Sequence, residues 1–119
     1  MSFERALALA DVPEDEAVGV TLGTQGVAVA RHGDEVFAVE DQCSHAAVPL
    51  SEGEVERDGG SCTLECWLHG SRFDLRTGQP SGFPATEPVA TFPTEVRDTP
   101  DGPRVYVDTT TTLNGVTPA

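Results

Sequence analysis

The stretch that decides the fold is Gly26-Val27-Ala28-Val29-Ala30-Arg31-His32-Gly33-Asp34-Glu35-Val36-Phe37-Ala38-Val39. Two valine-rich runs flank Arg31-His32-Gly33-Asp34-Glu35, which carries the glycine and aspartate typical of a turn. Valine favours a strand because its branched side chain packs well on a pleated surface. The stretch therefore predicts a β-hairpin that pairs residues 27–31 with residues 36–39.

Further strand patterns lie on both sides of this hairpin, separated by short turns. Each pattern is rich in valine or alternates between apolar and polar residues, which favours a strand with one buried face. The 9 Pro and 12 Gly are spread along the chain, as frequent turns require, and no long helix is indicated. We therefore predict an all-β protein, built as an antiparallel sandwich or barrel. The other predicted strands are residues 3–9, 18–22, 54–57, 61–65, 73–75, 94–97 and 104–108.

Length and charge limit the possible functions. The 119 residues suffice for one domain, which we place at residues 1–108, and the polar, aperiodic residues 109–119 are expected to form a flexible C-terminal tail. Asp and Glu number 20 against 7 Arg and no Lys, so the formal net charge is −13. Because such a charge repels phosphate, we expect no binding to nucleic acid or to an anionic membrane.

The cysteine content suggests metal ligands or core residues rather than disulfides. No run approaches the roughly 18 apolar residues of a membrane span, and Met1-Ser2-Phe3-Glu4-Arg5 lacks the basic lead of a signal peptide. We therefore expect a cytoplasmic protein, in which thiols stay reduced. The 3 Cys are also an odd number, so no disulfide scheme pairs them all.

Two short motifs carry metal-ligand chemistry. Cys43-Ser44-His45 is followed, after twenty intervening residues, by Cys66-Trp67-Leu68-His69. A single Cys and His close together usually arise by chance. Here two such pairs each follow a predicted strand and lie next to turn residues, and two thiolates with two imidazoles form a ligand set that metals prefer.

Two kinds of metal centre fit this ligand set. Zinc takes two Cys and two His in a tetrahedral site, but usually from a pair of close cysteines and a pair of close histidines. Here each motif supplies one of each, which suits a binuclear centre with both thiolates on one iron and both imidazoles on the other. A zinc-stabilised binding module without a redox role stays the alternative from a different class.

The second motif and the residues after it resemble a known signature. Cys43-Ser44-His45, followed by Cys66-Trp67-Leu68-His69-Gly70-Ser71-Arg72-Phe73-Asp74-Leu75, is similar to the two-loop signature of Rieske [2Fe–2S] proteins. Ligand order, spacing and the trailing His-Gly-x-x-Phe-Asp pattern agree together. The likeness extends from about Phe3 to Asp108, and it is strongest to small Rieske ferredoxins of bacterial ring-hydroxylating dioxygenase systems.

The resemblance implies a fold and a cofactor. The fold is an antiparallel β-sandwich of three sheets with a cluster-binding tip, made by two ligand loops and a proline-rich loop that Gln79-Pro80-Ser81-Gly82-Phe83-Pro84 matches. The cofactor is one Rieske [2Fe–2S] cluster per chain. By position, Cys43 and Cys66 would bind one iron, and His45 and His69 the other.

Several residues depart from the respiratory branch of this family. Val48 and Leu68 stand where that branch has two cysteines that form a disulfide at the tip. Ser71 is kept but Phe73 replaces a Tyr whose hydroxyl donates to the cluster, so we expect a reduction potential in the lower part of the Rieske range. Trp67 stands where the family often has Pro, and shielding of the cluster, contact with a partner and simple packing are all open.

The function that the resemblance implies is electron transport rather than catalysis. Such a ferredoxin is a one-electron carrier between a flavoprotein NAD(P)H reductase and a terminal non-haem iron oxygenase, with both partners docking at the cluster tip and the carrier monomeric. A Rieske ferredoxin for iron–sulfur assembly is an alternative. Another is the small subunit of nitrite reductase, which often lacks the ligands that are all present here.

Other reactive or charged residues receive plainer interpretations. Cys62 is expected to be a core thiol, and His32 an exposed residue of the hairpin turn. The acids Glu52, Glu54 and Glu56 follow the first motif closely. They are ordinary solvated acids unless they face the same tip, where they would form a docking surface.

Overall fold

The computed structural model describes residues 3–33, 35–43, 48–58, 61–68, 70–81 and 87–118. No helix in these ranges has the length and apolar character needed to cross a membrane. The elements of the described chain are β1 (Glu4–Ala8), η1 (Leu9–Asp11), β2 (Glu16–Leu22), β3 (Gln25–His32), β4 (Glu35–Glu40), η2 (Leu50–Glu52), β5 (Val55–Asp58), β6 (Ser61–Glu65), β7 (Arg72–Asp74), β8 (Thr91–Phe92), β9 (Thr94–Thr99) and β10 (Gly102–Val107), of which η1 and η2 are 3-10 helices.

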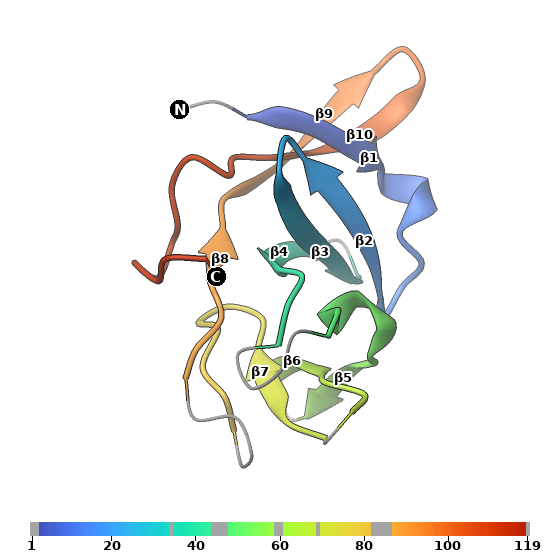
Figure 1. Cartoon of the computed structure of the whole chain (residues 1–119). Coiled ribbons are helices and arrows are strands. Elements are labelled where there is room, and N and C mark those ends of the chain that lie inside the picture. Colours follow the sequence, from blue (N-terminus) through green and yellow to red (C-terminus); the bar gives the residue numbers. More distant parts are fainter. Residues whose placement is uncertain are drawn as a thin grey trace.

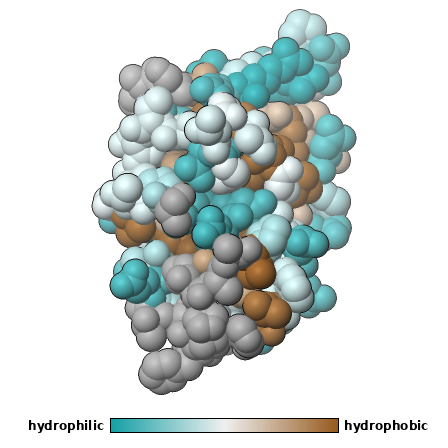
Figure 2. Space-filling model, viewed as in Figure 1, coloured by the Kyte–Doolittle hydropathy of each residue, from teal (hydrophilic) through white to brown (hydrophobic). Residues whose placement is uncertain are grey.

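The strands form three antiparallel sheets. Their orders are β1-β10-β9, β2-β3-β4-β8 and β5-β6-β7, and the sheets follow one another from the top to the bottom of Figure 1. On the face shown in Figure 2, the surface over the β9–β10 hairpin at the top is mostly hydrophilic. This arrangement confirms the predicted all-β, three-sheet fold.

The hairpin predicted from the deciding stretch is β3 and β4. Val29 lies opposite Ala38 and Arg31 opposite Val36, so the two runs form the expected antiparallel pair. Gly33, in the turn, has a φ of 60°, a conformation that glycine adopts without steric cost. β2 also pairs with β3, across a turn that contains Gly23, and this second hairpin was not predicted.

Strand β3 is buried on both faces, because the central sheet separates two apolar cores. Ala28 and Ala30 point into one core, while Val27 and Val29 point into the other, as the two-residue period of a strand requires. The first core, here called the cysteine core, consists of Ala28, Ala30, Phe37, Val39, Cys43, Leu50, Val55, Cys62, Leu64, Cys66, Phe73, Leu75 and Val89. The second core consists of Val12, Leu22, Val27, Val29, Ala38, Ala90, Phe92, Val105 and Val107.

The residues after β10 run back along β8 without regular secondary structure (Figure 1). The N–H of Leu113 donates to the carbonyl oxygen of Thr91 at 2.8 Å, and Val116 packs against the second core. The segment expected to be a flexible tail therefore makes specific contacts up to Val116, and Ala119 lies outside the described residues. Hydrogen exchange is the measurement that determines how much of it moves.

Candidate metal centre

The first ligand loop starts at Cys43, three residues after β4 ends, and is closed at two levels. The N–H of Cys43 donates to the carbonyl oxygen of Val48 at 3.0 Å. Further out, the carboxylate of Asp41 accepts from the N–H and from the hydroxyl of Ser51, each at 2.7 Å. The chain therefore leaves and returns at fixed points, and the Cys43 side chain at the root of the loop is buried.

A glycine in the neighbouring strand makes room for the outer closure. A Cβ at Gly19 would lie 2.7 Å from both the Asp41 carboxylate and the Ser51 hydroxyl oxygen, which is too close for a carbon atom. The N–H of Asp41 donates to the carbonyl oxygen of Gly26 at 3.0 Å. The first loop is thus held against the central sheet from two strands.

The second ligand loop starts at Cys66, directly after β6. The N–H of Cys66 donates to the carbonyl oxygen of Ser71 at 2.7 Å, and the N–H of Gly70 donates to the Cys66 carbonyl oxygen at 2.9 Å. Gly70 has a φ of 79°, so it reverses the chain at low steric cost. Both cysteines therefore lie at the closed root of a short loop.

Arg72, directly after the second loop, forms two ion pairs. Glu65 and Arg72, the residues just before Cys66 and just after Ser71, lie opposite each other in the β6–β7 ladder. The guanidinium of Arg72 lies 3.3 Å from the Glu65 carboxylate and 2.7 Å from that of Glu56 in β5. All three side chains are partly exposed, so the pairs contribute little to stability and mainly orient Arg72.

The two ligand loops are adjacent because Gly53, just after η2, touches the strand that leads to Cys66. A Cβ at Gly53 would overlap the carbonyl oxygen of Glu65 and lie 2.9 Å from its carbonyl carbon. The N–H of Glu65 also donates to the carbonyl oxygen of Glu54 at 2.9 Å. The segment that leaves the first loop is therefore hydrogen-bonded to the segment that enters the second.

The cysteine positions fit an iron–sulfur cluster. Cys43 and Cys66 are both buried in the cysteine core, and none of the cysteines forms a disulfide. Apolar neighbours such as Leu50, Leu64 and Phe73 share that core, which limits the access of water to the thiols. Two thiols from two adjacent loops, in apolar surroundings, suit one iron of such a centre. The predicted ligands His45 and His69 lie outside the described residues.

Cys62 shares the cysteine core but differs in its surroundings. It lies within β6, and its carbonyl oxygen accepts from the N–H of Leu75 at 2.9 Å. Burial raises the pKa of the Cys62 thiol above its usual value, with smaller contributions from nearby charges. A neutral thiol held in a strand is a core residue, which is the role expected from the sequence.

The proline-rich segment begins as an additional strand partner of β7. Pro80 forms an antiparallel bridge with Phe73, and the N–H of Ser81 donates to the carbonyl oxygen of Arg72 at 2.8 Å. The N–H of Asp74 donates to the carbonyl oxygen of Gln79 at 2.9 Å. The start of this segment therefore lies beside the strand that follows the second ligand loop, and residues 82–84 lie outside the described residues.

The second loop exposes two large apolar side chains. Trp67 is 51% exposed and Leu68 40% exposed, so Trp67 does not serve core packing. Phe73, where respiratory relatives carry Tyr, is fully buried and brings no hydroxyl, whereas Ser71 is buried and keeps one. These positions agree with the departures noted in the sequence.

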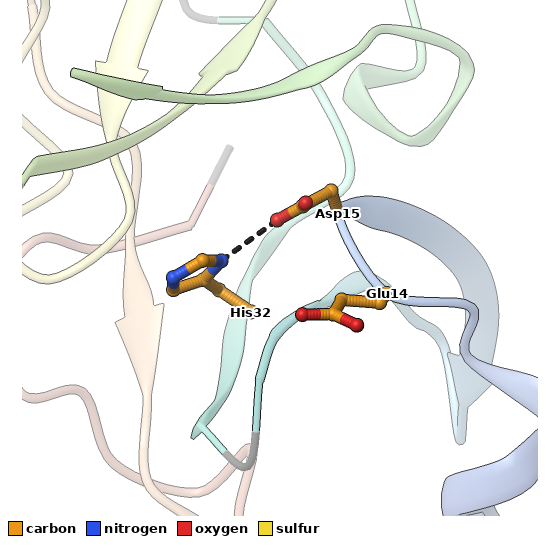
Figure 3. A group of neighbouring side chains, drawn as sticks. All are labelled: Glu14, Asp15 and His32. Atoms are coloured by element: carbon orange, nitrogen blue, oxygen red, sulfur yellow. Dashed lines mark hydrogen bonds and ion pairs between the residues drawn. The ribbon is translucent and has the colours of Figure 1, made fainter.

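A separate group of possible ligands consists of Glu14, Asp15 and His32 (Figure 3). The Nδ1 atom of His32 lies 2.7 Å from the Asp15 carboxylate, and its Nε2 atom lies 3.0 Å from the guanidinium of Arg57. Because both ring nitrogens are engaged and one faces a cation, we assign this group a structural role between β3 and β5. His32 is 18% exposed, so it is more enclosed than expected.

Several residues that shape the site have no recognisable local pattern. Asp41 and Ser51 are ten residues apart, and Gly53 is one glycine among the 12 in the chain. Their roles depend on contacts between segments that are distant in sequence. The importance of Gly53 would be recognisable only from related sequences in which this glycine is invariant.

Comparisons with known proteins agree with this description. The profile of the Rieske [2Fe–2S] domain matches residues 3–93. The ferredoxin subunit of anthranilate 1,2-dioxygenase from Burkholderia cepacia is 45% identical over 91 residues, which are 76% of this chain and 81% of that protein.

Two solved structures extend the likeness to the fold. The ferredoxin of carbazole 1,9a-dioxygenase from Nocardioides aromaticivorans matches with a TM-score of 0.79 at 30% identity, over 90% of this chain and 97% of that one. A chain in the complex of reduced oxygenase and oxidised ferredoxin in carbazole 1,9a-dioxygenase matches with a TM-score of 0.75 at 35% identity, over 88% of this chain and 100% of that one. This chain therefore belongs to the Rieske [2Fe–2S] domain family, whose single Rieske cluster is its cofactor.

Proposed function

We propose that this protein is the ferredoxin component of a ring-hydroxylating dioxygenase system. It accepts one electron from a flavin-dependent NAD(P)H reductase and passes it to a terminal non-haem iron oxygenase. The observation that carries the proposal is the likeness, over most of both chains, to a ferredoxin subunit of one dioxygenase and to the ferredoxin in complex with the oxygenase of another. These relatives are ferredoxins, which supports a carrier rather than an enzyme.

The proposed ligands are Cys43 and Cys66 for one iron, and His45 and His69 for the other. When bound, the cluster takes up and releases one electron. The buried positions of the two cysteines, at the closed roots of adjacent loops, support their part of this assignment. Main-chain hydrogen bonds hold both roots, so the thiolates need not reorganise when the charge of the site changes, which favours electron transfer.

Metal and spectroscopic measurements test the proposed cofactor and role together. We expect two irons and two acid-labile sulfides per chain, and a rhombic EPR signal after dithionite reduction with an average g below that of all-cysteine clusters. Because Phe73 offers no hydroxyl, we expect a potential in the lower part of the range of about −150 to +300 mV. One zinc per chain without an EPR signal would instead support the zinc-binding module.

The two alternative ferredoxin roles have less support. The nitrite reductase small subunit often lacks the cluster ligands, whereas Cys43, His45, Cys66 and His69 are all present in this sequence. A role in iron–sulfur assembly would not require the likeness to dioxygenase ferredoxins. We also propose a monomeric carrier, because one exposed end must meet two partners in turn, and a cytoplasmic one, because the ligand thiols must stay reduced.

The docking surface that we propose combines exposed apolar and acidic side chains. Trp67 and Leu68 supply exposed apolar area at the second ligand loop, and exposed aromatic residues are enriched at protein interfaces. Glu52 and Glu54 are exposed just after the first loop, at a polar hollow of about 430 Å³ that Asp15 also lines. Glu56 is instead paired with Arg72, so it is a weaker candidate.

Neutralising the two free acids should slow the encounter with the redox partners. The double variant Glu52→Gln/Glu54→Gln should lower the rate of reduction by the reductase roughly threefold or more at low salt, because long-range attraction to a basic partner speeds association. Stopped-flow reduction at several ionic strengths measures both the rate and its dependence on salt, which should become flatter.

A matched control separates local from global charge. Asp98→Asn/Asp101→Asn removes the same two charges from the β9–β10 hairpin, in the sheet at the opposite end of the molecule (Figure 1). We expect this variant to keep most of the wild-type rate. Equal slowing in both variants would show that net charge causes the effect. Unchanged kinetics in the Glu52→Gln/Glu54→Gln variant would show that these two acids play no part in docking.

A further inference from the structure

The side chain of Asn114, in the segment after β10, takes part in four hydrogen bonds to main-chain groups. Its Nδ2 group donates to the carbonyl oxygens of Thr77, at 2.9 Å, and Val89, at 2.8 Å. Its Oδ1 atom accepts from the N–H groups of Thr91, at 3.3 Å, and Val116, at 3.2 Å. Two donors facing carbonyls and an acceptor facing N–H groups fix the orientation of the amide and use its full hydrogen-bonding capacity.

The two carbonyls that Asn114 binds belong to the two ends of the proline-rich loop. Thr77 precedes this loop and Val89 follows it, and the N–H of Val89 donates to the carbonyl oxygen of Gly78 at 2.9 Å. The loop is therefore closed by one main-chain hydrogen bond and by one side chain that bridges both ends. That side chain comes from 25 residues beyond Val89.

The junction is packed too closely to admit a substitute for Gly78. This residue has a φ of 76°, which favours glycine. A Cβ at Gly78 would overlap the carbonyl oxygen of Val89 and lie 2.7 Å from Nδ2 of Asn114. The amide and the glycine thus form one compact junction, in which moving either partner separates the ends of the loop.

A short series of hydrogen bonds connects this junction to the second ligand loop. Asp74 binds the carbonyl oxygen of Gln79, and Ser81 binds that of Arg72, at 2.9 and 2.8 Å. Arg72 directly follows Ser71, whose carbonyl oxygen accepts from the N–H of Cys66. The start of the proline-rich loop is therefore fixed on one side by the Asn114 junction and on the other by the root of a proposed ligand loop.

We propose that Asn114 is a positioning residue for the cluster site: it holds Gly78 and Val89 together, which keeps residues 79–81 hydrogen-bonded to β7 and so stabilises the root of the second ligand loop. The effect on the cluster rests on the proposed function, whereas the hold on the loop does not. Asn114 lies outside residues 3–93, which the family profile matches. On this proposal the C-terminal segment helps to hold the cluster site in place.

Two variants of Asn114 and one matched control test this proposal. Asn114→Asp keeps the size and the acceptor but removes both donors, and Asn114→Ala removes all four hydrogen bonds. Thr99→Val is the control, because it also removes hydrogen bonds between a side chain and the main chain in the distant β9–β10 turn. The Thr99 hydroxyl donates to the carbonyl oxygen of Gly102 at 2.7 Å and accepts from the N–H of Asp101 at 3.3 Å.

Two readouts separate the hold on the loop from its consequence. Hydrogen exchange followed by mass spectrometry should show roughly tenfold faster exchange in peptides that cover residues 78–89 of both Asn114 variants, and no change in β3. The visible absorbance of the cluster in air should decay several-fold faster in these variants than in the wild type. Thr99→Val should change neither quantity, even where its thermal unfolding midpoint falls equally.

The outcomes are distinguishable. Cluster decay at the wild-type rate in Asn114→Asp, or equally fast decay in Thr99→Val, would overturn the proposal. Unchanged exchange at residues 78–89 would overturn the hold on the loop itself. Should Asn114→Ala fail to fold, Asn114→Asp still gives both readouts. A wild-type protein without iron or sulfide would refute the proposed function, while the exchange experiment on that protein would still test the hold.

Discussion

Cys66→Ser and Cys43→Ser are each expected to lose iron and sulfide completely, whereas Cys62→Ser is expected to retain both. A serine hydroxyl stays protonated at neutral pH and is a poor iron ligand, so either proposed ligand variant leaves one iron incompletely bound. All three cysteines are buried in one core, so the three substitutions are chemically and sterically matched. Iron and sulfide analysis with EPR of the reduced proteins gives the comparison.

The same comparison controls for stability. A buried hydroxyl costs about 1–3 kcal/mol where it finds no partner, and each of the three serines replaces a thiol in the same apolar core. Thermal unfolding of the three proteins without cluster should therefore give similar midpoints. Loss of iron in Cys62→Ser, or its retention in Cys43→Ser, would show that the ligand assignment is wrong.

Gly53→Ala should cause a large loss of stability and of bound iron. The new Cβ would overlap the carbonyl oxygen of Glu65, a main-chain atom next to Cys66 that cannot move alone. Overpacking costs about 1–3 kcal/mol where side chains can adjust, and we expect the upper end or more here. The ligand loops would separate, so both the free energy of unfolding and the iron content should fall.

Gly23→Ala provides a comparison for this substitution. Gly23 has a φ of 64° and no atom close to an added Cβ, so alanine there meets backbone strain without a collision. Urea denaturation should show a smaller loss of stability than in Gly53→Ala, and the iron content should equal that of the wild type. A Gly53→Ala protein with wild-type stability and iron would contradict the close approach of the two segments.

The strands were predictable because local pattern and tertiary environment agree in them. The run around Val27 and Val29 is apolar at every position, and β3 is indeed buried on both faces. The two-residue β8 carries too little pattern to be recognised, and the pairing of β1 with β10 joins opposite ends of the chain. Such pairings follow from how the sheets pack, which no short window of sequence contains.

The proposed ligands of the candidate site could be named from the sequence, whereas the residues that hold its loops could not. Cys43 and Cys66 stand out because cysteine and histidine are scarce and their spacing is distinctive. The polar residues that hold the loops, such as Asp41 and Asn114, belong to types that are common in any loop. Asn114 in particular lies in a segment that reads as a tail, because its partners are main-chain carbonyls, which leave no trace in the pattern of side chains.

The closure of both ligand loops by main-chain groups has a consequence for how such a carrier diversifies. The hydrogen bonds from Cys43 to Val48 and from Cys66 to Ser71 involve only N–H and carbonyl groups, so they persist whatever side chains the loops carry. Trp67 and Leu68 can therefore be exchanged without opening the second loop. On the docking surface proposed above, such exchanges would redirect the carrier to a new partner while the main-chain closure of the loop stays the same.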